Sequence, residues 1–210
     1  DMAAQCVLHD GSDNPAILSA AIIAYHGANG KNINDNFFFH PELESLGKWY
    51  RQLMGESIGK EFDIHGKKIH AGITPTVSVG STDLHSLAQL YLGGPKDKIT
   101  TFVCVTQKMA DDTIHDTIYF SGLADVVAGK KASDIMLAIY GGVKAAYQKN
   151  ELPFTEVVFR DLSPYALGEY MQFKMCEMMY CAKLLRVNAF DQPAVEKYKE
   201  ETRSILSAQG

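Results

Sequence analysis

Clusters of cysteine and histidine are missing from this sequence. The chain has four cysteines, and no two of them form a C-x-x-C pair. In 210 residues such scattered cysteines do not make a disulfide framework, which favours a reducing, cytoplasmic compartment. The seven histidines show no spacing of the kind that holds zinc. We therefore predict neither a metal site nor a disulfide-stabilised fold.

An excess of positive charge and a long unbroken apolar run are also missing. The net charge is −5, whereas nucleic acids and membrane surfaces are usually bound by basic faces. The longest hydrophobic region, 163–187, is interrupted by Glu169, Lys174, Glu177 and Lys183. It therefore predicts a buried helix and not a membrane span. We expect no nucleic-acid partner and no membrane partner.

The sequence does have the composition and patterning of an ordinary globular chain. Hydrophobic residues make up 46% and charged residues 21%, and 210 residues can bury one full core. Helix signals alternate with strand signals, which predicts an α/β fold: a three-layer α/β/α sandwich around a mainly parallel sheet, with ligands at the carboxyl ends of its strands. The predicted helices cover 16–25, 41 to about 56, 81–93, 134–148, 164–185 and 193–207; the predicted strands cover 34–39, 76–79, 98–106, 117–120 and 154–161; most of 61–80 is predicted to be loop.

The residues 188–199, NAFDQPAVEKYK, form the most informative stretch. Pro193 suits the first turn of a helix, where its missing N–H costs nothing, and Glu196 suits the positive end of the helix dipole. Gln192 and Lys199 are about two turns apart and share one helix face, so both could contact one small polar ligand. The alternative is a solvated C-terminal helix with a good start signal.

A second informative stretch is GESIGK at 55–60. It is one residue short of a P-loop, and Glu61 follows where a P-loop has Ser or Thr, which argues against ATP binding of that type. Glu56 lies at the carboxyl end of the helix that begins near Pro41, where the helix dipole and burial would make it a stronger base. The alternative is an exposed glutamate at a helix end.

The third stretch is STDLHS at 81–86. Ser81 or Thr82 can cap the helix that follows, which places His85 in its first turn or just past it. The positive end of the dipole favours the neutral imidazole, which can exchange protons with a substrate. The alternative is a capped helix with an incidental histidine.

Together these three stretches resemble the glucose-6-phosphate isomerase family. The stretch 188–199 is similar to its signature N-P-F-D-Q-x-G-V-E-x-x-K, with Ala189 and Ala194 in place of the commoner Pro and Gly. The stretch 55–60 is similar to its E-S-x-G-K motif, and 81–89 is similar to its D-x-H-[SA]-x-x-Q motif. The three occur in the family's order, and the resemblance covers only the C-terminal part of the longer family chains.

The resemblance implies a division of the chain and a reaction. Residues 1–162 would form the second sugar-isomerase-type α/β/α domain, and 163–210 would form a C-terminal helical arm that packs on it and completes the site. The reaction would interconvert an aldose and a ketose, glucose 6-phosphate and fructose 6-phosphate, through a cis-enediol or enediolate. The family uses no cofactor and no metal, and the parent protein would be a homodimer.

The resemblance also implies roles for four residues. Glu56 would be the base that moves a proton between C1 and C2, and His85 would open the sugar ring in the active site of the neighbouring subunit. Lys199 would lie at the ring and aid its opening, while Gln192 would contact the substrate. The family's phosphate cradle and its enediolate-stabilising arginine belong to the N-terminal half. This chain would therefore need that missing half as a partner and would be inactive alone.

Two other functions remain open at the level of sequence. A non-catalytic sugar-phosphate-binding module with the same fold would also explain the resemblance, although it would need no base such as Glu56. An interaction fragment held in a dimer by its helical arm would use the apolar stretch 171–179. A buried core helix is the simpler explanation of that stretch.

Overall fold

Four parallel strands form the centre of the protein. The computed structural model describes residues 2–8, 11–106, 112–115 and 125–208. In their order across the sheet, the strands are β4 (Thr74–Val79), β1 (Ile33–Phe38), β5 (Lys98–Val105) and β6 (Phe154–Phe159). The predicted strand at 117–120 lies outside the described residues. The parallel α/β architecture expected from alternating helices and strands is confirmed.

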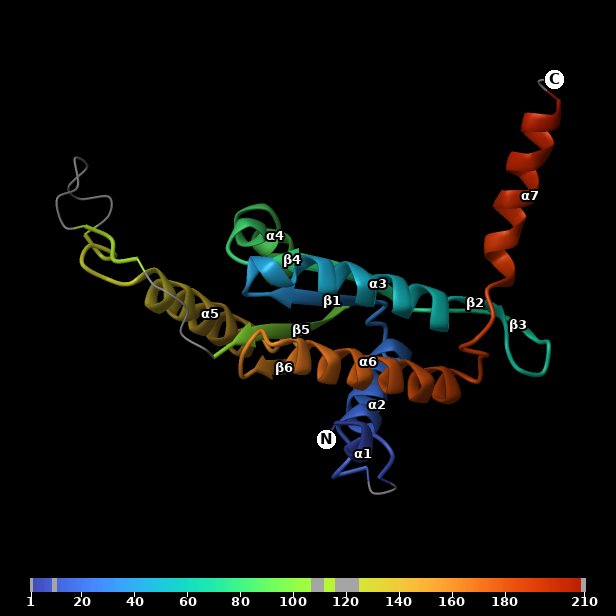
Figure 1. Ribbon diagram of the computed structural model, residues 1–210, viewed down its shortest axis with the longest axis horizontal. Helices are drawn as coiled ribbons and strands as arrows, with labels where there is room; N and C mark the ends of the chain where they lie inside the picture. The colour runs from blue at the N-terminus through green and yellow to red at the C-terminus, as the bar shows by residue number, and fades with distance from the viewer. Residues whose placement is uncertain (1, 9–10, 107–111, 116–124, 209–210) are drawn as a thin grey trace.

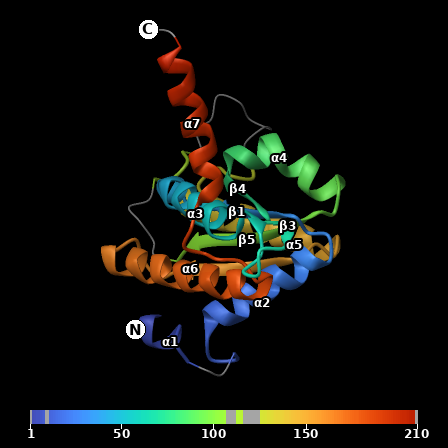
Figure 2. The ribbon, with the colours of Figure 1, turned by 90° about the vertical axis from the view of Figure 1, so that its right-hand side faces the viewer.

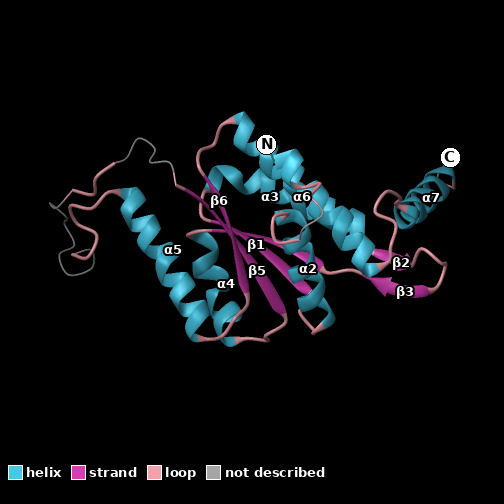
Figure 3. Ribbon diagram, turned by 90° about the horizontal axis from the view of Figure 1, so that it is seen from below, coloured by secondary structure: helices cyan, strands magenta, loops and turns pink. Residues whose placement is uncertain are grey.

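Helices cover both faces of this sheet, as Figures 1 and 3 show. One face carries α4 (Thr82–Gly93) and α5 (Ala132–Lys149); the other carries α3 (Glu44–Ile58) and α6 (Pro164–Leu185), with α2 (Pro15–Ala28) packed beside α6. Successive side chains of a strand point to opposite faces. Phe37 and Phe39 therefore join the aromatic cluster under α4 and α5, whereas Phe38 packs with Tyr170 of α6. The predicted three-layer sandwich follows directly from this alternation.

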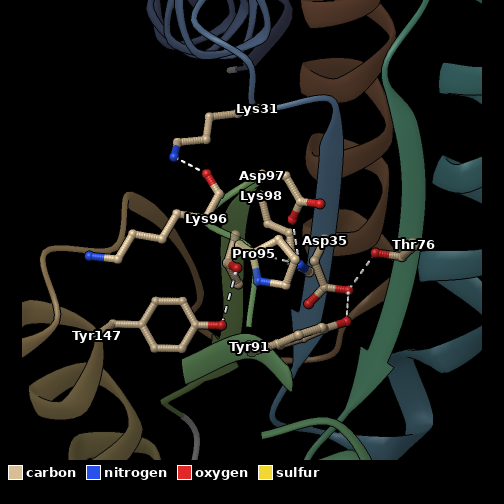
Figure 4. A network of polar contacts seen from close by, with 10 residues as sticks. Lys31, Asp35, Thr76, Tyr91, Pro95, Lys96, Asp97, Lys98 and Tyr147 are labelled. Carbon is tan, nitrogen blue, oxygen red and sulfur yellow. Dashed lines mark hydrogen bonds and ion pairs between the residues drawn. The ribbon is translucent and has the colours of Figure 1, made fainter. Parts of the chain in front are cut away.

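A buried carboxylate connects α4 to the sheet. Asp35, in the middle of β1, has no exposed surface, and its Oδ1 accepts hydrogen bonds from Thr76 Oγ1 (2.7 Å) and Tyr91 OH (3.0 Å), as drawn in Figure 4. Ser78 Oγ donates a third, at 2.9 Å. Burial raises the pKa of Asp35, and the hydroxyl donors oppose that shift. Because Thr76 and Ser78 belong to β4 and Tyr91 belongs to α4, these bonds hold α4 in place on its face of the sheet.

The segment 61–80 is more regular than the sequence indicated. β2 (Lys60–Phe62) and β3 (Lys68–Ala71) pair antiparallel as a separate two-stranded sheet, and β4 is a full strand. The prediction of a mainly loop-like segment is therefore wrong. Asp63 Oδ1 accepts two backbone N–H groups of the hairpin turn, at 2.9 and 2.8 Å, and this local contact supports strands that are too short to show periodicity.

The helices begin and end close to their predicted limits, with two differences. The stretch that starts at Pro41 opens as a 3₁₀ turn, η1 (Pro41–Leu43), before α3 begins. A short helix, α1 (Met2–Gln5), precedes α2. The limits of α6 agree with the prediction because Ser163 caps its first turn and Pro164 follows directly.

The last helix, α7 (Pro193–Ser207), projects away from the sandwich (Figures 1 and 2). None of its residues is buried, whereas α6 buries eight residues. Lys197 of α7 forms an ion pair with Glu61 of β2 at 2.9 Å. The proposed boundary after residue 162 stays a prediction. In the part of the chain that the structure describes, no helix is long and apolar enough to cross a membrane.

Candidate functional site

A hollow of about 430 Å³ lies where α3 ends, beside the β2–β3 hairpin and the start of α7. Because α3 follows β1 and returns along the sheet in the opposite direction, its last turn lies beyond the amino ends of the strands. This hollow is thus at the edge opposite to the carboxyl ends of the strands, where we expected ligands to bind. The expectation of ligands at the carboxyl ends stays a prediction. Its lining residues are Gly55, Glu56, Gly59, Lys60, Glu61, Phe62, Asp63, Asn188, Asp191, Gln192, Pro193, Ala194, Val195 and Lys197.

Two of the predicted site residues meet at this hollow. Gln192 Nε2 donates a hydrogen bond to Glu56 Oε2 at 2.9 Å, although the two residues are 136 positions apart. Gln52, one helical turn earlier on α3, donates to Glu56 Oε1 at 3.0 Å. Glu56 lies in the last turn of α3, as predicted, but it is half-buried and not buried. Each carboxylate oxygen accepts one bond, so the carboxylate keeps free lone pairs that face solvent.

The backbone around Gln192 explains why its side chain is free to reach α3. Gln192 occupies the position before α7, Pro193 opens the helix as predicted, and the Gln192 side chain makes no capping hydrogen bond. The preceding turn is closed by Asn188, whose Oδ1 accepts from Phe190 N (3.0 Å) and whose Nδ2 donates to Asp191 Oδ2 (2.9 Å). Asn188 and Asp191 thus shape the turn that leads into α7.

Lys60 is a residue of this site that the sequence did not single out. Its side chain is only 5% exposed, and its Nζ donates to the carbonyl oxygens of Glu56, at 2.7 Å, and Asp191. The same Nζ lies 3.2 Å from Asp191 Oδ1. In the sequence Lys60 is the last residue of a stretch that fails as a P-loop and is similar to the E-S-x-G-K motif, and nothing in either pattern predicts its contact with Asp191.

Lys199 lies on the exposed part of α7 and is not among the residues that line the hollow. Its Nζ binds Glu196 Oε1 at 2.7 Å, and Arg203 Nη2 lies 3.5 Å from the same carboxylate. The hydrogen bond to Glu196 raises the pKa of Lys199. Lys199 is thus held as an ammonium on the helix surface and does not contact Gln192 or Glu56 in this arrangement.

His85 lies on another part of the molecule. It is an exposed residue early in α4, which follows β4 and so begins at the carboxyl edge of the sheet, opposite to the edge where Glu56 lies. The predicted cap is wrong, because Ser81 stands before the helix but its side chain makes no capping bond. Asp83 instead accepts hydrogen bonds from Val79 N (2.7 Å) and Ser86 Oγ (3.0 Å).

The cysteines do not offer a nucleophile. All four are free and buried. Burial raises the pKa of Cys6 to about 11 and that of Cys181 to about 12, which keeps both thiols protonated near neutral pH. Among the residues that the structure describes, no group of three or more His, Cys, Asp or Glu side chains could hold a metal ion. The hollow is lined by carboxylate, ammonium and amide groups, and the Glu56 carboxylate and the Gln192 amide are the predicted site residues among them.

Relatives with known names match all or nearly all of the chain. It is 32% identical to the glucose-6-phosphate isomerase of Carboxydothermus hydrogenoformans over 210 residues, which is 100% of this chain and 45% of the relative. It is 32% identical to the glucose-6-phosphate isomerase of Methanocaldococcus jannaschii over 195 residues, which is 93% of this chain and 46% of the relative. The chain thus spans a little under half the length of these relatives.

Solved structures share the fold. A hypothetical protein of Thermus thermophilus superposes with a TM-score of 0.86 and 28% identity, over 97% of this chain and 48% of the other. A glucose-6-phosphate isomerase of Chlamydia trachomatis superposes with a TM-score of 0.79 and 20% identity, over 98% of this chain and 41% of the other. The family model described as phosphoglucose isomerase matches residues 10–209, and the chain therefore belongs to the phosphoglucose isomerase family.

Proposed function

We propose that this chain is the C-terminal part of a cytoplasmic glucose-6-phosphate isomerase. The whole protein would interconvert glucose 6-phosphate and fructose 6-phosphate through a cis-enediol or enediolate, without a cofactor. The contact between Glu56 and Gln192 carries the proposal, because it joins two stretches that resemble separate motifs of the family into one hollow. The family membership and the names of the relatives support the same reaction.

Glu56 is assigned the proton transfer. Aldose–ketose isomerisation moves a proton between C1 and C2 of the open sugar, which needs one base on one face of the two carbons. The Glu56 carboxylate is oriented by amide donors on both oxygens and keeps lone pairs free to accept the proton. Gln192 uses its NH₂ group to hold Glu56, which leaves its carbonyl oxygen to accept a hydrogen bond from a sugar hydroxyl.

Ring opening is assigned to Lys199 and His85. Lys199 would leave Glu196 for the ring oxygen or a hydroxyl of the bound sugar, since a 44% exposed ammonium exchanges partners at little cost. His85 lies at the opposite edge of the sheet from Glu56, so it cannot serve the Glu56 of its own chain. It would serve the site of a second copy, which is consistent with a homodimeric parent.

The chain by itself lacks the charge that the reaction needs. An enediolate and a phosphate are both anionic and require cations or dipoles close by. In the described part of the chain, Glu56 forms no ion pair, Lys60 is buried and paired with Asp191, and Lys197 is paired with Glu61. The remaining cations would come from the N-terminal half that the relatives possess, so we expect no useful turnover from this chain alone.

A coupled isomerase assay tests this assignment. The purified chain is assayed with fructose 6-phosphate, alone and after addition of the N-terminal half of the Carboxydothermus relative. We expect turnover only when both are present. Robust turnover by the chain alone would contradict the expected dependence on the second half. Sugar-phosphate binding without turnover in the mixture would favour the alternative, a non-catalytic sugar-phosphate-binding module.

A substitution separates the two functions within the active mixture. Glu56→Gln keeps the shape and removes the base, so turnover should fall by about 100- to 10,000-fold, the usual contribution of a general base, while sugar-phosphate binding persists. Glu44→Gln is the matched control, because Glu44 lies at the exposed start of the same helix and pairs with Lys48. Unchanged turnover in Glu56→Gln would remove Glu56 from the mechanism.

A further inference from the structure

Lys60 is a charged residue whose side chain is almost fully buried, although its ionic partner is exposed. Its side chain is 5% exposed, whereas its ionic partner Asp191 is 50% exposed. Lysine is rarely buried unless it is paired, because removing an ammonium from water costs several kcal/mol. A lysine kept in such a place, between two stretches that build the hollow, therefore has contacts that compensate for its desolvation.

The contacts of Lys60 are with protein groups on both sides of the hollow. An ammonium has three donors and no acceptor. Lys60 Nζ donates hydrogen bonds to the carbonyl oxygens of Glu56 and Asp191, and the Asp191 carboxylate lies 3.2 Å away as its ionic partner. The side chain is almost fully buried, so a substrate would have to displace one of these contacts to reach the ammonium. Its role is to hold protein groups.

The groups that Lys60 holds are the two halves of the candidate site. The Glu56 carbonyl belongs to the last turn of α3, where carbonyl groups lack partners within the helix and favour a nearby cation. Asp191 belongs to the turn closed by Asn188, and Gln192 is the next residue. The ammonium therefore joins the backbone of the residue that bears the proposed base to the turn that presents its amide partner.

We propose that Lys60 is a positioning residue that sets the distance between Glu56 and Gln192. Without it, the polar link between the turn at 188–192 and the end of α3 would be the exposed amide–carboxylate bond. The remaining contact of this segment with α3 is apolar packing of Val187 and Ala189, which lacks the direction needed to fix the Gln192 side chain against Glu56. The assignment of an effect on catalysis rests on the proposed isomerase function, whereas the mechanical link between the two segments does not.

Hydrogen exchange on this chain tests the link directly. In Lys60→Met, backbone amides of 187–192 should exchange about 10-fold faster, because the loss of a charge-assisted contact opens the turn locally. Lys68→Met is the matched control: Lys68 lies on the same hairpin, is 58% exposed and pairs with Glu61. It should leave exchange in 187–192 unchanged. Unchanged exchange of β5 in both variants shows that the fold is retained.

A second variant keeps the test decisive if Lys60→Met unfolds the chain. Asp191→Asn removes the charge at the exposed end of the same contact, keeps an oxygen that can accept from Asn188 Nδ2, and creates no cavity. It should also speed backbone amide exchange in 187–192. If both single variants fold, the variant that combines the two substitutions should exchange no faster than Lys60→Met alone. Additive effects, or wild-type exchange in 187–192 for either folded variant, would overturn the proposal.

Kinetics then distinguish positioning from simple stability. In the mixture with the N-terminal half, Lys60→Met should lower kcat by about 100-fold, as expected for a misplacement of about 1 Å, and change KM by less than threefold. A fall in kcat that disappears at lower temperature, or a change in KM alone, would contradict positioning. The exchange measurements use this chain alone, so they decide the link whether or not the mixture is active, and a failure of the link can be told apart from a failure of the proposed function.

Discussion

A buried ion pair links the three helices on one face of the sheet, and its removal can be predicted quantitatively. Lys174 and Glu177 lie one turn apart on α6, with their charged atoms 2.8 Å apart and their side chains 1% and 0% exposed. Glu177 also accepts hydrogen bonds from Ser19 Oγ of α2 (2.5 Å) and Tyr50 OH of α3 (2.7 Å). Burial and the charge of Glu177 raise the pKa of Tyr50 well above its ordinary value, so Tyr50 remains a donor at neutral pH.

Lys174→Met removes the cation and keeps most of the apolar side chain. It leaves a carboxylate without a cation in a place where water does not reach, a change that costs about 3–5 kcal/mol. For a chain of 150–250 residues, one kcal/mol corresponds to about 2–4 °C in Tm, so Tm should fall by about 6–20 °C. Because Tyr50 belongs to α3, loss of this pair would also loosen the helix that ends at Glu56.

Urea unfolding followed by far-UV circular dichroism measures this cost on the purified chain. The double variant Lys174→Met/Glu177→Gln should be more stable than Lys174→Met alone, because the neutral amide needs no cation. Lys183→Met is the control, since Lys183 is an exposed residue of the same helix and should change stability by less than about 0.5 kcal/mol. A loss below about 1 kcal/mol in Lys174→Met, or costs that simply add in the double variant, would refute the reasoning.

Two further predictions concern packing and pH. Gly47→Ala would place a methyl carbon 2.5 Å from Phe38 Cε2, so it should lower the free energy of unfolding by about 1–3 kcal/mol. Gly142→Ala is the control, because its methyl carbon would meet nothing within 4 Å. Equal melting temperatures of the two variants would contradict this prediction. Hydrogen bonds led by the one from Lys197 lower the pKa of Glu61 from 4.5 to about 2, so its contribution to stability is complete above pH 4.5 and is lost as the pH falls through 2. Lys197→Met should raise that pKa toward 4.5 in a carboxyl NMR titration; an unchanged pKa would show that the ion pair does not form in solution.

Helix starts are the features that the sequence predicted best, because the signals are local. Asn14 caps α2 by accepting from two backbone N–H groups at 3.0 Å, and Ser163 caps α6 by accepting from Ala166 N at 3.2 Å. A proline follows each of these caps, and another opens α7. A cap and a proline act within one turn of the chain, so the pattern and the structure agree without help from distant residues.

Short strands were harder to predict for the opposite reason. β2 has three residues and β3 has four, too few for an alternation of apolar and polar side chains to stand out. Pro75 also lies inside β4, which a central strand would not tolerate. The structure places β4 at the edge of the sheet, where one side of the strand needs no ladder partner and a proline can be accommodated.

By itself, the sequence determined the class of fold, the limits of the long helices and the stretches from which the candidate site is built. Periodicity and caps depend on residues a few positions apart, and the resemblance depends on the order of short stretches. Only the tertiary structure decided that Glu56 meets Gln192, that Lys60 binds Asp191, and that His85 lies at the far edge of the sheet. These contacts join residues that are 131 or 136 positions apart in the sequence. They depend on how α3, the hairpin and the turn before α7 pack against one another, and no pattern of neighbouring residues encodes that packing.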